Sequence, residues 1–110
     1  MAFSTRRFSG VSGANEALTV SATGSRFRLL WVTAKYSAAP TQTGVVVTLN
    51  SALGAAYDTA LSTGAANTQA NTYIPTGNII IEPGDAIDVL APAAGGAVTS
   101  AVVVCCEFVE

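Results

Sequence analysis

The chain has 110 residues, of which 50% are hydrophobic and 11% are charged, and it carries five Lys or Arg, seven Asp or Glu and no His, for a net charge of −2. The lack of histidine excludes Ser-His-Asp and Cys-His nucleophiles and histidine metal sites, and five basic residues are too few for binding nucleic acid by phosphate neutralisation. A chain of this length allows one domain, which we place at residues 1–110. Soluble domains are about a quarter charged, so we predict that the weakly charged surface of this domain is covered by partners.

No apolar run approaches the roughly 20 residues that cross a bilayer, and the start of the chain lacks the apolar core of a secretory signal peptide. We therefore expect synthesis in a cytoplasm and no membrane partner. The adjacent Cys105 and Cys106 would point to opposite faces of a strand, and their spacing fits no redox or metal motif. We expect both to be buried and the chain to bind no metal or cofactor.

Short segments rich in β-branched and aromatic residues alternate with Gly, Pro, Ser and Asn clusters at intervals of about 8–12 residues. This pattern is typical of an all-β protein, and we predict a single-domain antiparallel β-sandwich, jelly-roll-like, with about eight strands. The predicted strands are residues 3–8, 16–22, 26–36, 45–50, 56–61, 78–81, 86–91 and 98–109.

Residues 26–36 and 51–62 each lead to a further prediction. Alternation along residues 26–36 places Phe27, Leu29 and Trp31 on one face, and we expect Trp31 to lie in the core because tryptophan is buried on average. Residues 51–62 fit a helical apolar stripe, but Gly54 and the all-β surroundings favour a strand over 56–61. A helix is the alternative there.

The polar and Pro/Gly-containing segments of the chain predict a loop and a turn. Residues 63–72 are polar and of low complexity, and they predict a long loop. Tyr73, which follows them, is expected to be the exposed aromatic residue. The segment 82–85 (EPGD) predicts a type II turn, because proline fixes φ at its second position and glycine supplies a positive φ at its third.

The carboxylates Glu82, Asp85 and Asp88 lie close together in the sequence, with Asp58 further away. Asp85 belongs to the predicted turn and Asp88 to the strand that follows it, and nothing marks a cleft between them. We therefore interpret these carboxylates as groups of a solvated turn with local hydrogen bonds rather than as a catalytic pair. A calcium ion shared between subunits through Glu82 or Asp85 is the alternative, although no calcium-binding loop is present.

Four of the five basic residues fall within the first 28 positions: Arg6, Arg7, Arg26 and Arg28. One interpretation is that these arginines protect edge strands, because charged side chains on an edge prevent sheets from aggregating. The other is a docking face for an acidic partner, since arginine binds carboxylates in pairs. We take these four arginines as candidate docking residues and residues 1–14 as a candidate extended docking arm.

The last predicted strand is apolar on both of its faces between residues 101 and 106. A strand of an antiparallel sandwich normally shows one face to water. We therefore expect one face in the core and the other, which carries Ala101, Val103, Cys105 and Val109, in an oligomer interface. Cover by the chain's own loops is the alternative.

Residues 45–51 (VVVTLNS), 54–61 (GAAYDTAL) and 79–89 (IIIEPGDAIDV) resemble small structural proteins of tailed bacteriophages, among them jelly-roll or β-sandwich capsid decoration ("cement") proteins and some tail or fibre modules. The resemblance implies a non-enzymatic virion protein that assembles in the host cytoplasm. It also implies a homo-oligomer, with a trimer favoured, that stabilises the shell by binding the major capsid protein. A tail or fibre module and a carbohydrate-binding β-sandwich are the alternatives.

Overall fold

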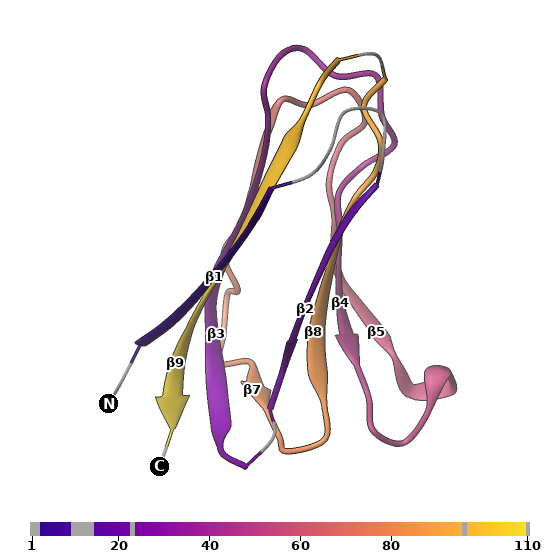
Figure 1. Cartoon of the computed structure of the whole chain (residues 1–110). Coiled ribbons are helices and arrows are strands. Elements are labelled where there is room, and N and C mark those ends of the chain that lie inside the picture. The colour runs from indigo at the N-terminus through magenta and orange to yellow at the C-terminus, as the bar shows by residue number, and fades with distance from the viewer. Residues whose placement is uncertain (1–2, 10–14, 23, 96, 110) are drawn as a thin grey trace.

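Within residues 3–9, 15–22, 24–95 and 97–109, the part of the chain that the computed structural model describes, nine strands form two antiparallel sheets that lie face to face (Figure 1). For residues 3–9 only the backbone is described. The strands are β1 (Phe3–Ser9), β2 (Glu16–Ser21), β3 (Arg26–Tyr36), β4 (Val46–Asn50), β5 (Thr59–Thr63), β6 (Ala70–Tyr73), β7 (Ile80–Ile81), β8 (Ala86–Ala91) and β9 (Ser100–Val109), and a 3-10 turn η1 (Ala55–Tyr57) precedes β5.

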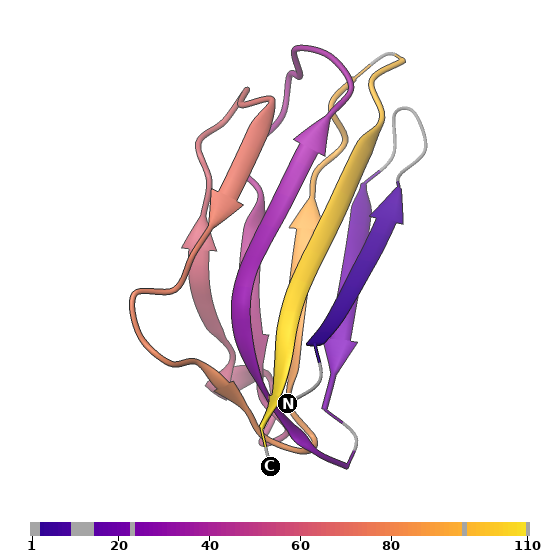
Figure 2. The same cartoon turned by 90° about the vertical axis from the view of Figure 1, so that its left-hand side faces the viewer.

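The first sheet has the order β1-β9-β3-β6, with β7 also paired to β3, and the second has the order β2-β8-β4-β5. Figure 2 shows the first sheet from its outer side. Strands that follow each other in the chain mostly lie in different sheets, which is the arrangement of a double-sheet jelly roll. The predicted all-β, jelly-roll-like sandwich is confirmed.

Strands β6 and β7 occupy successive positions along one side of β3. The register of β6 runs from Val32 to Lys35, and that of β7 covers Phe27 and Arg28. Together they make one edge strand that residues 74–79, which contain Pro75, interrupt. The polar segment 63–72 was predicted as a loop throughout, and this was wrong for its end, because Ala70–Tyr73 gains a hydrogen-bonding partner in β3.

All eight predicted strands have a counterpart in the structure. The disputed segment 51–62 divides, because its middle forms η1 and its end begins β5, so the preference for a strand is confirmed only from Thr59 onward. The predicted type II turn is present: the Asp85 N–H donates to the Glu82 carbonyl oxygen at 2.9 Å, and Gly84 has φ 96°. None of the helical segments described is long and apolar enough to span a membrane.

The core fills the space between the two sheets with side chains from both inner faces. Its largest fully buried members are Tyr36, Leu29, Ile81, Ile87, Val32, Val89, Val102, Val104 and Cys106. Along β3 the buried positions are Phe27 and Leu29, and then Val32, Ala34 and Tyr36. The register with β9 shifts between Leu29 and Trp31, so a bulge of one residue reverses the alternation at that point.

This bulge corrects the prediction for Trp31. The side chain is only partly buried and does not belong to the core. Trp31 lies opposite Cys105 in the register, on the outer face of the first sheet. Strict alternation would have placed it inside with Leu29, and that alternation fails where β3 gains an extra residue.

Candidate functional site

Strand β9 lies in the middle of the first sheet, between β1 and β3, and its two faces differ in burial. Ser100, Val102, Val104 and Cys106 are buried against the second sheet. The outer set predicted as an oligomer interface is Ala101, Val103, Cys105 and Val109; three of these side chains are partly exposed and Cys105 is only 9% exposed. The four therefore share the outer face, and their role in an interface stays a prediction.

The predicted docking arginines of β3 are both in ion pairs. The Arg28 guanidinium donates from Nη1 to Oε1 of Glu107 at 2.7 Å, across the β3–β9 register, with 32% and 13% of the two side chains exposed. The Arg28 Nε is buried and has no hydrogen-bond partner among the described residues. The Arg26–Glu82 pair is longer, at 3.6 Å, and about half exposed. Arg26 is thus more available to a partner than Arg28.

Arg6 and Arg7 lie in β1, opposite Val104 and Val103 of β9. Their side chains fall outside the described part of the chain. Within the candidate arm of residues 1–14, residues 3–9 pair with β9 as an edge strand of the first sheet, whereas residues 1–2 and 10–14 lie outside the described residues. A docking role for this segment stays a prediction.

The outer face of the second sheet carries a shallow groove that the sequence did not reveal. It is lined mainly by Ala17, Thr19, Val46, Thr48, Asp88 and Leu90. The Asp88 carboxylate accepts hydrogen bonds from the Thr19 hydroxyl at 2.7 Å and from the Asn50 amide at 2.8 Å. The alternation of Ile87 and Val89 with Asp88 and Leu90 predicts that Asp88 lies on the strand after the turn, and the structure confirms this. The sequence did not predict a groove beside it.

The remaining carboxylates hold turns together. Asp85 Oδ1 accepts a hydrogen bond from the Ala52 N–H, and Asp58 Oδ1 accepts one from the Ser51 N–H, both at 2.8 Å. In the described residues, no three His, Cys, Asp or Glu side chains gather as a metal site would require. Both carboxylates are thus hydrogen-bonding groups of turns, as predicted, although only the Asp58 bond is local and the Asp85 bond joins two turns that are far apart in the sequence.

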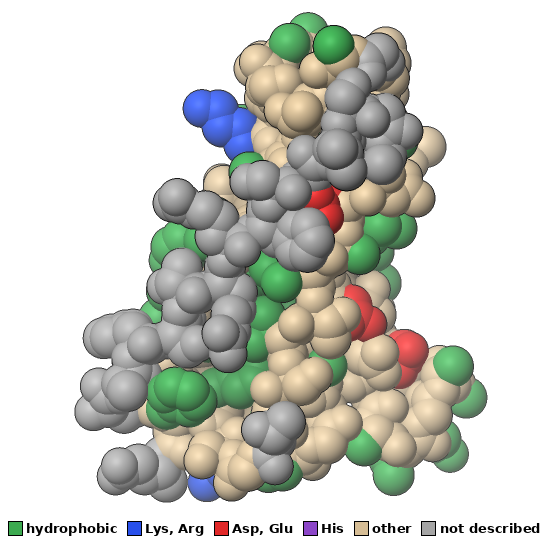
Figure 3. Space-filling view, in the orientation of Figure 1, with side chains coloured by type: hydrophobic (Ala, Val, Ile, Leu, Met, Phe, Trp, Pro, Cys, Tyr) green, Lys and Arg blue, Asp and Glu red, His purple; other side chains and the backbone are tan. Residues whose placement is uncertain are grey.

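The loop that Asp58 and Asp85 hold projects from the second sheet and is apolar. Leu53 and Tyr57 are 78% and 63% exposed, and the three alanines between Ser51 and Asp58 are exposed as well. Figure 3 shows hydrophobic side chains gathered at this projecting corner, at the lower right. Tyr57, not Tyr73, is therefore the strongly exposed tyrosine. Tyr73 is partly buried against the core, which corrects the prediction.

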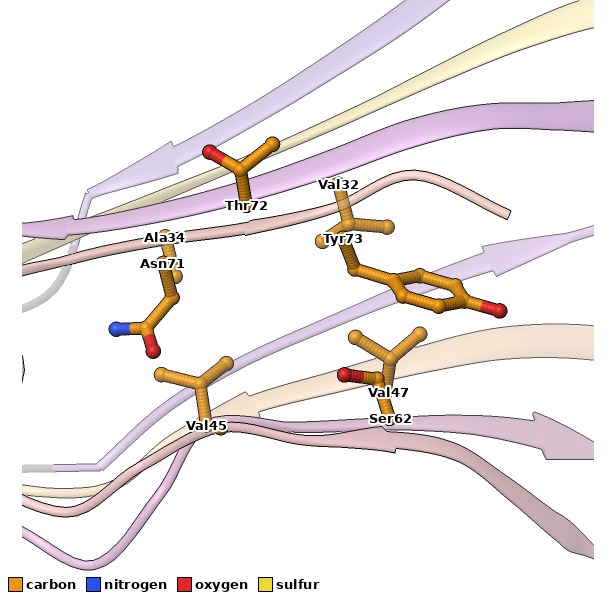
Figure 4. A pocket seen from close by; sticks show the side chains of 9 residues that line it. Val32, Ala34, Val45, Val47, Ser62, Asn71, Thr72 and Tyr73 are labelled. Atoms are coloured by element: carbon orange, nitrogen blue, oxygen red, sulfur yellow. The ribbon is translucent and has the colours of Figure 1, made fainter. Parts of the chain in front are cut away.

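A small cavity lies between the two sheets at the side formed by β5 and β6 (Figure 4). Val32 of β3 and Tyr73 of β6, neighbours in the first sheet, face Val47 of β4 across it. The Asn71 amide lies on the side of the first sheet, and the Ser62 hydroxyl lies on the side of the second. Its volume of ≈ 50 Å³ leaves room for a few water molecules and for nothing larger. Its lining contains no carboxylate, cysteine or histidine, so we assign it no chemistry.

No protein-family model matches the sequence, and no curated protein matches it. Among solved structures, the chain is similar to a virus-like particle of extra small virus from the giant freshwater prawn Macrobrachium rosenbergii, with 12% identity over 100% of this chain and 82% of that one, and a TM-score of 0.32. It is also similar to infectious bursal disease virus, strain Gx with 13% identity over 97% of this chain and 32% of that one, and strain Gt with 10% identity over 96% and 42%, each with a TM-score of 0.27. The chain thus spans less than half the length of the bursal disease virus chains. These neighbours are viral, and their similarity to this chain is weak.

Proposed function

We propose that this chain is a non-enzymatic structural component of a virus particle, a decoration or cement protein that works as a homo-oligomer on the shell. The observation that carries the proposal is the central strand β9. Its inner side chains Val102 and Val104 are fully buried, and its outer face still presents Ala101, Val103 and Val109. An apolar outer face on the middle strand of a sheet fits cover by a neighbouring chain.

The oligomer, a trimer in the simplest case, would bury that outer face between copies, and the shell partner would be the major capsid protein. Arg26, with Arg6 and Arg7 of β1, would supply the charged contacts to the shell, while Arg28 would first have to leave Glu107. The exposed Leu53 and Tyr57 would add apolar contact. Burial of apolar area contributes about 25 cal/mol per Å² before the costs of association are subtracted.

The test is binding to empty shells of the encoding virus. The protein is incubated with the shells, the mixture is sedimented, and the pellet is imaged. We expect the protein to sediment with the shells at repeated lattice positions and to raise the temperature at which they disrupt. Protein that stays in the supernatant, with shells of unchanged stability, would contradict the proposal.

A carbohydrate-binding module is the second candidate, because Tyr57 offers an exposed ring and Trp31 is partly exposed. Trp31 is the sole tryptophan of the chain, so a sugar that binds beside it should shift the fluorescence. A saturable shift with soluble glycans, together with no shell binding, would favour this second candidate.

A further inference from the structure

The basic residues of this chain all lie on one of its two sheets. Every basic residue lies on β1 or β3 of the first sheet: Arg6, Arg7, Arg26, Arg28 and Lys35. The strands of the second sheet contain no Lys or Arg and carry Glu16 and Asp88, while Asp58 and Asp85 directly precede β5 and β8. Figure 3 shows this division, with basic side chains on the left and acidic side chains toward the right.

The described residues form two ion pairs, and the charges that these pairs do not neutralise are positive on the first sheet and negative on the second. They join Arg26 to Glu82 and Arg28 to Glu107. Among the described residues, no acidic group lies within 4.0 Å of the Lys35 ammonium, and no basic group lies that close to the Asp88 carboxylate.

The surroundings of Lys35 and of Asp88 complement each other. Lys35 is exposed, and the register places the small residues Ala70 and Ala101 on either side of it, so another surface can approach the ammonium closely. Asp88 lies in the groove of the second sheet, beside Leu90, and neutral donors hold its carboxylate in place. A fixed carboxylate whose partners are all neutral keeps a net negative charge, and this charge attracts a cation from outside the chain.

We propose that the groove around Asp88 receives a second copy of this chain, whose first sheet docks by its outer face and places Lys35 at Asp88. The complementary charges favour a copy of the chain itself, because each copy carries both surfaces. The ion pair would fix the orientation of the contact, and the apolar side chains around it would supply most of the buried area.

The contact joins two different surfaces, so it is heterologous and builds a closed ring, of which a trimer is the smallest, or an open stack. The proposal rests on the proposed function only in that copies of the chain associate. It adds the surface that receives the outer face of β9 and β3.

A charge-reversal experiment on the isolated protein tests it, with light scattering or sedimentation over a range of concentrations. Lys35→Glu and Asp88→Lys should each weaken self-association about tenfold or more, because like charges then meet. The double variant K35E/D88K should restore it, since the pair is rebuilt with its charges exchanged. Asp58→Lys makes the same charge change as Asp88→Lys at a residue outside the groove and should leave self-association unchanged.

Circular dichroism checks the folding of each variant. If Asp88→Lys does not fold, Asp88→Asn removes the charge at nearly constant shape, and it should weaken the association and reduce its dependence on salt. A wild-type oligomer whose size no variant changes, or a double variant that is not restored, overturns this contact and leaves the shell-binding proposal standing. A wild-type monomer at all concentrations overturns both this contact and the homo-oligomer. Variants that lose shell binding but associate normally would assign the groove to a shell protein instead, which also overturns the contact.

Discussion

Gly44 lies so close to Gly64 that a Cβ atom at position 44 would stand 1.7 Å from the Gly64 carbonyl oxygen. The Gly64 N–H also donates to the Val45 carbonyl oxygen at 2.8 Å. The two glycines flank the paired ends of β4 and β5, where Val46 lies opposite Thr63. The backbones can meet at this point only because position 44 has no side chain.

Gly44→Ala should therefore lower the free energy of unfolding by about 2–3 kcal/mol, because a methyl group in that space forces the backbone apart. Gly77→Ala is the matched control, since a Cβ there would meet nothing within 4 Å. It should change stability by less than about 1 kcal/mol. Urea denaturation followed by circular dichroism measures both. Equal midpoints for the two variants would contradict the close approach.

The Arg28–Glu107 pair should stabilise the first sheet, because it is mostly shielded from water. We expect Arg28→Ala and Glu107→Ala each to lower the free energy of unfolding by about 1–3 kcal/mol. A double-mutant cycle should show a coupling of about 1 kcal/mol or more that salt changes little. The exposed Arg26–Glu82 pair is the control, and its coupling should be about 0–0.5 kcal/mol. Equal coupling in the two pairs would refute this interpretation.

Tyr36 should make the protein less stable in alkali. Burial raises the pKa of its phenol above the ordinary value of 10.0, and its hydroxyl donates to the Pro92 carbonyl oxygen at 2.8 Å. Above about pH 10 the unfolded chain loses this proton while the folded chain retains it, so stability falls as the pH rises. Tyr36→Phe should lose about 1 kcal/mol at neutral pH, and the difference from wild type should narrow above pH 10. A constant difference between the two proteins across urea denaturations from pH 7 to about 11 would disprove the effect.

Val103→Glu should dissociate the oligomer and leave the circular dichroism spectrum largely intact, because Val103 lies on the outer face of β9. Val104→Glu is its neighbour control. Val104 is fully buried, so this variant should unfold the chain. Light scattering reports size and circular dichroism reports folding. An unchanged oligomer in Val103→Glu would exclude the outer face of β9 from the interface.

The sequence was sufficient for the sandwich and for most strands, because each strand carries β-branched residues between clear turn signals. Alternation alone divides the side chains of β9 correctly into two faces, since its register against β3 is regular along residues 100–105. Which of the two faces is inner could not be predicted, because it depends on where the second sheet lies. Strand β6 could not be predicted, because its four residues (ANTY) are a strand only through their pairing with Val32–Lys35 of β3.

Trp31 and Asp88 show what the alternation of side chains along a strand cannot predict. The alternation that placed β9 correctly failed at Trp31, because a bulge of one residue is not visible in the composition of residues 26–36. Asp88 was placed correctly on the strand 86–91, yet its groove could not be predicted. The groove combines side chains of β2, β4 and β8, and that neighbourhood is fixed by the order of strands in the second sheet.

The break between β6 and β7 affects whether copies of the chain aggregate when they are held close together. An uninterrupted outer strand would offer a long row of unsatisfied amide and carbonyl groups to any adjacent molecule, which invites irreversible cross-β aggregation. Here residues 74–79, with Pro75, divide that row into a stretch of four residues and a stretch of two. At high local density, molecules would therefore find no long continuous strand along this edge on which to pair.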